Sequence, residues 1–180
     1  MIRYSEQHID HKDISSVIKT LKSNFITTGP QIQKFEEKLS KKVNSKYSVV
    51  FNSATSALHS ACIALGLKKN DWLWTSANSF VASANCGLYC GAKIDFLDIE
   101  LETFNIDLKK LEIKLQKAKK KLLPKIIVPV VFAGQSYDRD RLIILSKKYK
   151  FKILEDASHA LGAKYKNKSV GSCRDIITVF

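Results

Sequence analysis

The chain has 180 residues, of which 45% are hydrophobic, so it is long and apolar enough to bury the core of one domain and is not intrinsically disordered. Its formal net charge of +13 comes almost entirely from lysine, and the basic residues do not alternate with aromatic ones, which argues against a nucleic-acid partner. Because there is no run of about eighteen apolar residues and residues 1–6 lack the apolar segment of a signal peptide, we expect a cytoplasmic protein with no membrane partner.

The four cysteines indicate neither a disulfide framework nor a metal site. Cys86 and Cys90 are four residues apart in an alanine-rich helical pattern, where a free cysteine is typically a small buried hydrophobe. No histidine stands at ligand spacing from them, so we expect no bound metal.

Residues 1–45 are predicted to form a helical segment of their own. Apolar residues recur at helical spacing over 13–24 and again over 32–43, which predicts two helices. Between them, Thr28-Gly29-Pro30 marks a sharp turn. This turn is a plain connector unless another motif supports a binding role for it.

Residues 47–51 predict a short strand, and the hydroxyl-rich turn over 52–56 leads from it into a helix over 57–65. The free amides at the start of such a helix bind phosphate, and the hydroxyls of Ser53, Thr55 and Ser56 add donors. One of these hydroxyls could instead simply cap the helix, and the residues alone favour neither alternative. A Walker lysine and a Gly-x-Gly-x-x-Gly motif are both absent, which argues against a nucleoside triphosphate or a dinucleotide.

The same pattern of strand, polar turn and helix recurs over residues 72–90. Phe80 stands at the crossover from strand to helix, which borders the ligand crevice in an open α/β sheet. Its ring is therefore a candidate to stack on a planar ligand, although a core aromatic is the commoner role. A further strand is predicted over 93–98.

A helix is predicted from about residue 107, and an apolar strand over 125–132 follows it. Pro129 inside this strand indicates an irregularity or a sheet edge. Gln135 comes just after the C-terminal end of the strand, so it is a candidate ligand contact. The next helix is predicted over 138–148.

The apolar stretch over 151–154 ends in two carboxylates, which is typical of a buried parallel strand that delivers a side chain to the ligand crevice. Asp156 is then a candidate site residue, and His159 follows three residues later among small residues that leave room for a ligand. Taken alone, this stretch favours the plainer alternative, in which Asp156 caps the following turn and His159 is an ordinary polar residue. After a predicted hairpin over 163–171 and a last strand over 175–180, the alternation of strands and helices predicts a mainly parallel sheet covered on both faces.

A phosphate cradle, a stacking aromatic ring and a carboxylate are together what pyridoxal 5'-phosphate requires. In the order and context of these segments, the whole chain resembles the DegT/DnrJ/EryC1/StrS sugar aminotransferases. The matching motifs are Thr28-Gly29-Pro30, residues 52–58, residues 78–82, residues 155–160 and Gly171-Ser172. The resemblance implies a three-layer α/β/α fold like the large domain of aspartate aminotransferase, spanning residues 46–180 of this chain.

The resemblance also implies residue roles. Thr55 and Ser56 would hold the cofactor phosphate, and Phe80 would stack on the pyridine ring. Asp156 would pair with the ring nitrogen, and His159 would lie near the ring hydroxyl as the candidate catalytic residue.

The same resemblance extends to substrate and assembly. Thr28, Gly29 and Gln135 would border a nucleotide-linked sugar, whose C4 keto group receives an amino group from glutamate. Residues 70–93 are most similar to the members that act on UDP-linked 4-keto-6-deoxy amino sugars in pseudaminic acid biosynthesis. The full-length family implies a homodimer.

The family's Schiff-base lysine lies in a Ser-Phe-His-Pro-x-Lys-like phrase that would begin immediately after Phe180. None of the lysines present stands at the matching position, and the family's C-terminal small domain is absent from this chain as well. We therefore expect the 180-residue chain not to transaminate by itself. The alternative is a non-catalytic or regulatory relative that binds the cofactor or partner chains only.

Overall fold

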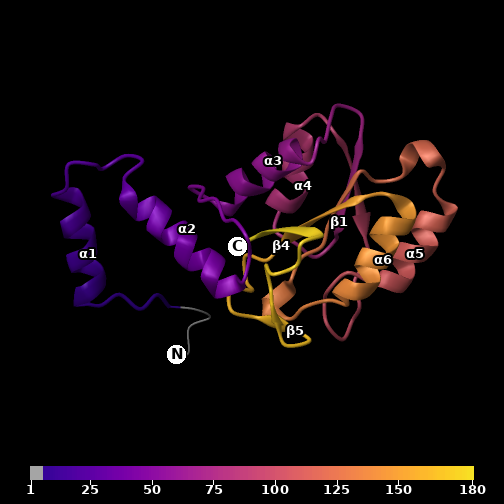
Figure 1. Ribbon diagram of the computed structural model, residues 1–180. Helices are drawn as coiled ribbons and strands as arrows, with labels where there is room; N and C mark the ends of the chain where they lie inside the picture. The colour runs from indigo at the N-terminus through magenta and orange to yellow at the C-terminus, as the bar shows by residue number, and fades with distance from the viewer. Residues whose placement is uncertain (1–5) are drawn as a thin grey trace.

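The computed structural model describes residues 6–180, in which three helices come first, strands and helices then alternate, and three more strands come last (Figure 1). The helices are α1 (His11–Leu21), α2 (Pro30–Val43), α3 (Ala54–Ala64), α4 (Ala82–Tyr89), α5 (Leu108–Lys117) and α6 (Arg139–Tyr149), with short 3-10 helices η1 (Lys120–Leu122) and η2 (Phe132–Gly134). The strands are β1 (Trp72–Ser76), β2 (Lys93–Leu97), β3 (Ile126–Val128), β4 (Lys152–Asp156), β5 (Lys164–Tyr165), β6 (Lys168–Ser169) and β7 (Ile176–Val179).

Five of the strands form one parallel sheet in the order β2-β1-β3-β4-β7. Thr75 of β1 lies opposite Phe96 of β2 and Val128 of β3, and Asp156 of β4 lies opposite Val179 of β7. Because the five strands run in one direction, their C-terminal ends meet at the same edge, which is where open α/β sheets bind ligands. The predicted α/β fold with a mainly parallel sheet is confirmed.

Two hydrophobic clusters on opposite faces of the sheet produce the three layers. Leu58 of α3 packs in the same cluster as Leu154 of β4, together with residues of α4. Leu142 of α6 packs in the other cluster with Ile153 of β4, together with residues of α5. Neighbouring residues of a strand point to opposite faces, so β4 supplies both cores.

The predicted strand over residues 47–51 is wrong. This segment has no regular secondary structure, and Tyr47 and Val49 are exposed. The Ser48 hydroxyl donates a hydrogen bond to the carbonyl of Glu36 (2.5 Å), and the amide of Val50 donates to the Glu36 carboxylate (2.9 Å). The segment bonds to α2 in place of a neighbouring strand, and β-rich residues form a strand only where such a partner is available.

The predicted strand over 125–132 is shorter than expected, because β3 ends at Val128. Pro129 has no amide hydrogen to donate, which favours an irregularity at this point. The carbonyl of Pro129 still accepts a hydrogen bond from the amide of Asp156 (2.9 Å). Since β3 lies inside the sheet, Pro129 marks an irregularity and not an edge.

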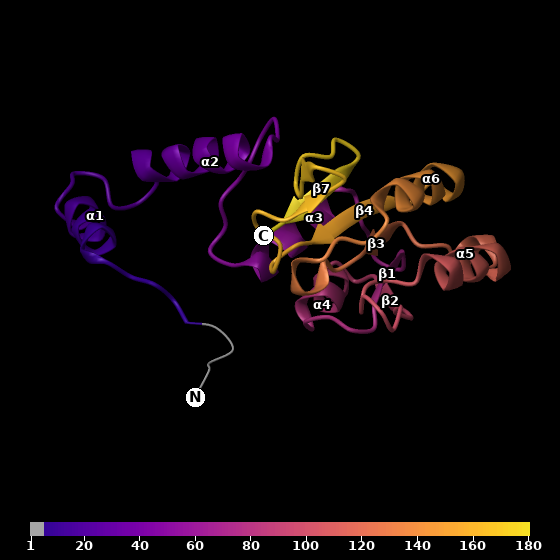
Figure 2. The ribbon, with the colours of Figure 1, turned by 90° about the horizontal axis from the view of Figure 1, so that it is seen from below.

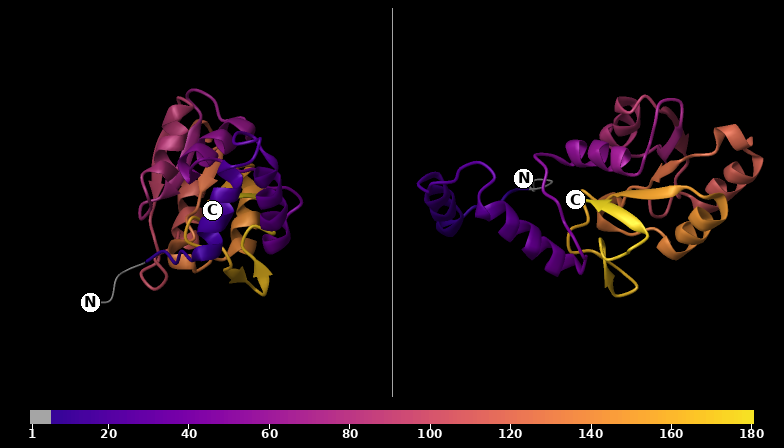
Figure 3. Two further views of the ribbon diagram at one scale, coloured as in Figure 1. Left: turned by 90° about the vertical axis from the view of Figure 1, so that its left-hand side faces the viewer. Right: turned by 45° about the horizontal axis from the view of Figure 1, so that its top comes forward.

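The N-terminal helices form an arm that extends away from the α/β body (Figures 1, 2 and 3). α1 buries none of its residues, and α2 buries only Val43. The apolar stripe of α1, which includes Val17 and Leu21, is exposed. The predicted helices of this segment are confirmed, while the division of the chain at residue 45 stays a prediction.

The predicted hairpin near the C-terminus is confirmed, because β5 and β6 pair in antiparallel fashion. Among the helices of residues 6–180, none is both long enough and apolar enough to cross a membrane. The expectation that the N-terminus lacks a signal-peptide segment concerns mainly residues 1–5, which lie outside the described part of the chain.

A salt bridge joins the residue before β1 to the residue before β3. Lys125 Nζ lies 2.9 Å from Asp71 Oδ2, which also accepts a hydrogen bond from the amide of Lys68 (2.8 Å). Partial burial acts to raise the pKa of Asp71, but the bonds from Lys125 and Lys68 outweigh it and hold the pKa below its ordinary value. The interaction therefore stabilises the fold above the ordinary carboxyl pKa, and this contribution is lost as the pH falls through the lowered one.

We expect Asp71→Asn to lower the free energy of unfolding by about 0.5 kcal/mol at neutral pH, since the pair is partly exposed. The difference from the wild type should shrink as the pH falls through the lowered pKa of Asp71, because protonation removes the same charge. Urea unfolding across this pH range measures it, with the exposed Glu102→Gln as the control. A difference that does not change with pH would contradict the assignment.

Candidate active site

The sheet fixes the position of Asp156 at the C-terminal end of β4. Its amide donates to the carbonyl of Pro129 (2.9 Å), and its carbonyl accepts from the amide of Val131 (2.9 Å). On the other side, the amide of Ala157 donates to the carbonyl of Val179 (2.7 Å). The backbone is therefore held between neighbouring segments, and the side chain points to the face covered by α3 and α4.

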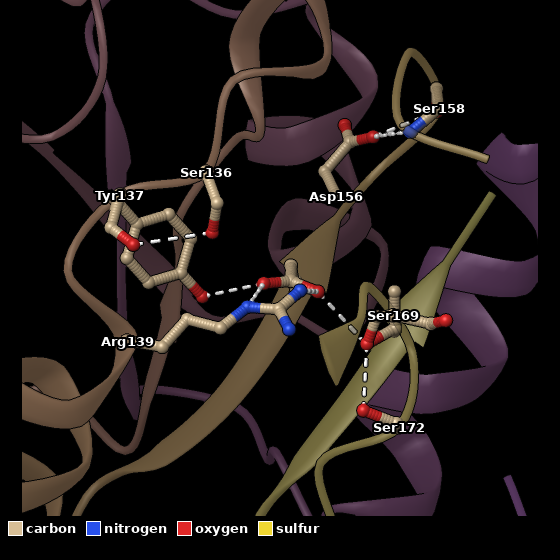
Figure 4. Close-up of polar contacts among 9 residues, drawn as sticks. Ser136, Tyr137, Arg139, Asp156, Ser158, Ser169 and Ser172 are labelled. Carbon is tan, nitrogen blue, oxygen red and sulfur yellow. Dashed lines mark hydrogen bonds and ion pairs between the residues drawn. The ribbon is translucent and has the colours of Figure 1, made fainter. Parts of the chain in front are cut away.

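Hydrogen bonds hold both oxygens of the Asp156 carboxylate, which is only 5% exposed. Ser83 Oγ donates to Oδ2 (2.5 Å), while Ser158 donates to Oδ1 from its hydroxyl (2.7 Å) and its amide (3.3 Å). Figure 4 shows Asp156 turned toward Ser158 and away from Arg139. A carboxylate offers about four acceptor positions, so one remains for a donor on a ligand.

Phe80 lies in the loop between β1 and α4, as predicted, and its side chain is 72% exposed. Its carbonyl accepts a hydrogen bond from the amide of Ser83 (3.1 Å), the same residue whose hydroxyl binds Asp156. The core role considered for this ring is therefore excluded. The loop that carries an exposed aromatic face is joined through one residue to the buried carboxylate.

The start of α3 follows from its hydroxyl-rich sequence. Ser53 caps the helix by accepting a hydrogen bond from the amide of Ser56 (3.2 Å), and Ser56 Oγ donates to Asn52 Oδ1 (2.8 Å). The amides of Ala54 and Thr55 precede the first possible intrahelical bond, so they are free to bind an anion. Figures 1 and 2 both place the start of α3 beside the C-terminal end of the chain, which follows β7.

His159 lies in the turn that follows Asp156, and it is exposed. Its ring meets the ring of Phe132 edge to face, with the two centroids 6.3 Å apart. His159 therefore lies at the C-terminal edge of the sheet close to η2. Its predicted place near a cofactor hydroxyl stays a prediction.

Gln135 follows η2 and is exposed, so its side chain is available to a ligand at this edge. Buried Asn105 holds the segment in place. Its side-chain amide donates to the carbonyl of Gln135 (2.9 Å), and its Oδ1 accepts from the amide of Phe132 (3.0 Å). The loop over 132–135 is thus fixed by its backbone, while Gln135 keeps a free amide group.

Thr28 and Gly29 are not brought near Asp156 within this chain. Thr28 has a positive φ of 49°, and Gly29 is the N-cap residue of α2. Both lie in the connection between α1 and α2, which Figure 1 shows on the arm and away from the sheet. Their assignment as sugar contacts stays a prediction.

Glu155 points to the opposite face from Asp156 and is fully buried in a network of donors. Arg139 donates to it from Nε (2.9 Å) and Nη2 (2.7 Å), Tyr137 from its hydroxyl (2.8 Å) and Thr178 from Oγ1 (2.9 Å). Figure 4 shows Tyr137 and Arg139 converging from one side. Burial raises the pKa of Tyr137 well above its ordinary value, with the charge of Glu155 adding to the effect, so the hydroxyl remains a donor.

Ser83, Asn105 and the partners of Glu155 were not predicted from the sequence. Ser83 stands three residues after Phe80 in the first turn of a helix, which is a recognisable signal once Phe80 is a candidate. The pairing of Glu155 with Arg139 has no comparable signal, because a long-range contact between a strand and a helix leaves no spacing pattern in the chain.

The residues at this edge fit pyridoxal phosphate. A protonated pyridine nitrogen needs an anionic acceptor in a dry place, and the carboxylate of Asp156 has one acceptor position left. The pyridine ring needs a flat apolar surface, and the Phe80 ring is exposed in the adjoining loop. The phosphate needs amide and hydroxyl donors, which the start of α3 supplies.

The amino-acid sequence matches a known family and several known proteins. The model of the DegT/DnrJ/EryC1/StrS aminotransferase family matches residues 7–180. A protein of Campylobacter jejuni strain 81-176, UDP-4-amino-4,6-dideoxy-N-acetyl-beta-L-altrosamine transaminase, is 45% identical over 176 residues, which cover 98% of this chain and 46% of that protein. The chain thus spans about half the length of the curated relatives that it matches.

Two solved structures share the fold. Helicobacter pylori PseC, an aminotransferase involved in the biosynthesis of pseudoaminic acid, superposes with a TM-score of 0.85 at 36% identity, over 94% of this chain and 44% of that one. Spr1654 of Streptococcus pneumoniae, assigned as a sugar aminotransferase and solved in its PMP form, gives a TM-score of 0.87 at 31% identity, over 95% of this chain and 45% of that one.

Proposed function

Because the chain belongs to the DegT/DnrJ/EryC1/StrS aminotransferase family, we propose that it forms the cofactor-binding part of a sugar aminotransferase that uses pyridoxal phosphate. The amino donor is glutamate, and the acceptor is the C4 keto group of a UDP-linked 4-keto-6-deoxy amino sugar in pseudaminic acid biosynthesis. The names of the similar Campylobacter and Helicobacter proteins support this choice of sugar.

The observation that carries the proposal is the environment of Asp156. A carboxylate that is 5% exposed, anchored on both oxygens and directed toward the face of α3 and α4 suits a heterocyclic cation. Asp156 would keep the cofactor nitrogen protonated by offering it a negative partner in a place of low polarity. When bound, the cofactor accepts the electrons released as the C–H bond beside the amine breaks.

The other cofactor contacts follow from the same edge of the sheet. Thr55 and Ser56 would bind the phosphate with the first amides of α3, because an anion is stabilised at a helix N-terminus. Phe80 would cover one face of the ring and keep water from it. His159, exposed beside Phe132, would lie near the ring hydroxyl and hold a proton there.

The sugar nucleotide would be bordered by Gln135 and by Thr28 and Gly29. Since Thr28 and Gly29 lie on the arm of α1 and α2, we propose that in the homodimer this arm brings them to a sugar site. In this proposal residues 1–45 form the arm, and residues 46–180 form the large domain that carries the cofactor.

Binding of pyridoxamine 5'-phosphate tests the cofactor part of the proposal, because the amine form needs no covalent bond to a lysine. Isothermal titration with the 180-residue chain should show saturable binding at one site per chain. Phe80→Ala should weaken it by about tenfold, since stacked aromatic contacts contribute roughly 0.5–1.5 kcal/mol beyond the area that they bury. Ile144→Ala, an exposed change on α6, is the control. Failure of the wild-type chain to bind would overturn the proposal.

Sequencing the gene beyond codon 180 tests the catalytic part of the proposal. A continuation that encodes the lysine phrase supports the aminotransferase, and a protein made with that continuation should convert the UDP-linked keto sugar to its amino product with glutamate. An unrelated continuation would favour the non-catalytic alternative and contradict the transfer reaction.

A further inference from the structure

Ser83 connects the two elements that the proposed site needs. Its side chain is fully buried in the first turn of α4, and its hydroxyl donates to Asp156 Oδ2 (2.5 Å). Its amide donates to the carbonyl of Phe80 (3.1 Å), and its own carbonyl accepts from the thiol of Cys86 (3.3 Å). One residue is therefore bonded at once to the carboxylate, to the loop of the exposed ring and to its own helix.

The two oxygens of Asp156 depend on different residues. Oδ1 accepts from both the amide and the hydroxyl of Ser158, so loss of that hydroxyl still leaves one donor. Oδ2 accepts from Ser83, and no second donor to this atom occurs among residues 6–180. The orientation of Oδ2 therefore depends on a single hydroxyl in a place that water reaches poorly, since Asp156 is 5% exposed.

We propose that Ser83 is a positioning residue. It orients the Asp156 carboxylate toward the cofactor ring nitrogen and fixes the position of that carboxylate relative to the Phe80 ring. This inference rests on the proposed function, because it assumes that a pyridine ring lies between the two. A hydrogen bond to a carboxylate is directional, so a carboxylate that turns about its Cβ–Cγ bond loses its alignment with the ring nitrogen. Ser83 prevents that rotation from the Oδ2 side.

The test compares the binding of two probes to the 180-residue chain. The first is pyridoxamine 5'-phosphate, and the second is its analogue with a C–H group in place of the ring nitrogen, which cannot pair with Asp156. Ser83→Ala should weaken binding of the first by about tenfold and leave binding of the second within about twofold. Ser158→Ala should weaken the first probe by only about threefold, since the Ser158 amide remains on Oδ1.

Two further variants separate positioning from folding. Ser83→Thr keeps the hydroxyl and should restore binding of pyridoxamine 5'-phosphate to within about threefold of the wild type. Ser83→Cys keeps a side chain of similar volume with a weaker donor. Its loss of affinity for pyridoxamine 5'-phosphate should therefore lie between the losses of Ser83→Thr and Ser83→Ala. Circular dichroism of each variant checks that the fold is kept.

The outcomes distinguish this inference from the function on which it rests. If the wild-type chain binds neither probe, the proposed function fails and the role of Ser83 fails with it. If the wild type binds pyridoxamine 5'-phosphate and Ser83→Ala binds it equally well, only the positioning role is overturned. Equal weakening of both probes also overturns it, because such a loss indicates general damage to the pocket.

Discussion

Replacing Arg139 by methionine is expected to lower the free energy of unfolding by about 3–5 kcal/mol, because it leaves the buried charge of Glu155 without its ionic partner. The carboxylate of Glu155 has no exposed surface, and Arg139 binds both of its oxygens at 2.9 and 2.7 Å. The remaining donors, Tyr137 and Thr178, carry no positive charge. Domains of this size have about 5–15 kcal/mol of stability, so the variant should be close to unfolding. Urea denaturation followed by circular dichroism measures the change.

The double variant Arg139→Met with Glu155→Leu is the matched control. A buried ion pair replaced by apolar groups of similar volume often costs little, so the double variant should recover most of the loss. Lys166→Met, which breaks an exposed pair with Asp140, should leave the urea midpoint nearly unchanged. If Arg139→Met behaves like Lys166→Met, the buried network does not stabilise the fold as proposed.

Asp156→Asn should weaken binding of pyridoxamine 5'-phosphate by about 10-fold to 100-fold. A hydrogen bond to a charged group contributes roughly 1.5–3 kcal/mol, and the neutral amide removes that charge from the partner of the ring nitrogen. The substitution keeps the size of the side chain, and its oxygen can still accept both bonds from Ser158, while the Ser83 hydroxyl can turn to accept from the amide nitrogen. Isothermal titration of the variant and the wild type under the same conditions gives the ratio of the two Kd values.

Asp95→Asn serves as the control for this second prediction. Asp95 lies in β2 and pairs with Lys114 on the face covered by α5, so its charge should not affect cofactor binding. The analogue without a ring nitrogen should bind wild type and Asp156→Asn about equally. Undiminished binding of pyridoxamine 5'-phosphate by Asp156→Asn would show that residue 156 does not meet the ring nitrogen.

Much of the fold could be predicted because its signals are local. The spacing of Leu108, Leu111 and Leu115 predicts α5, and the apolar run before Glu155 predicts β4. The strand predicted over 47–51 failed because a β-rich segment needs a neighbouring strand, and its amide at Val50 binds the Glu36 carboxylate in place of one. Strand propensity is a property of the segment itself, whereas strand pairing depends on whether another strand lies beside it.

The candidate site was predicted only in part. Asp156 at a strand end and Phe80 at a crossover could be chosen from the chain alone, because strand ends and crossovers in a parallel sheet meet at one edge. The buried partners of the two carboxylates could not be chosen in this way. Ser83 lies 73 residues from Asp156, and Arg139 lies 16 residues from Glu155, at separations that no local pattern records.

The order of apolar and polar residues was sufficient to indicate alternating helices and strands, a parallel sheet and two adjacent carboxylates at the end of β4. The folded chain alone settled which carboxylate faces which layer. Glu155 is enclosed by Arg139 and Tyr137 on one face, while Asp156 meets Ser83 on the other. The reason is geometric: successive side chains of a strand alternate between faces, but the helices that pack there bring their donors from distant parts of the chain.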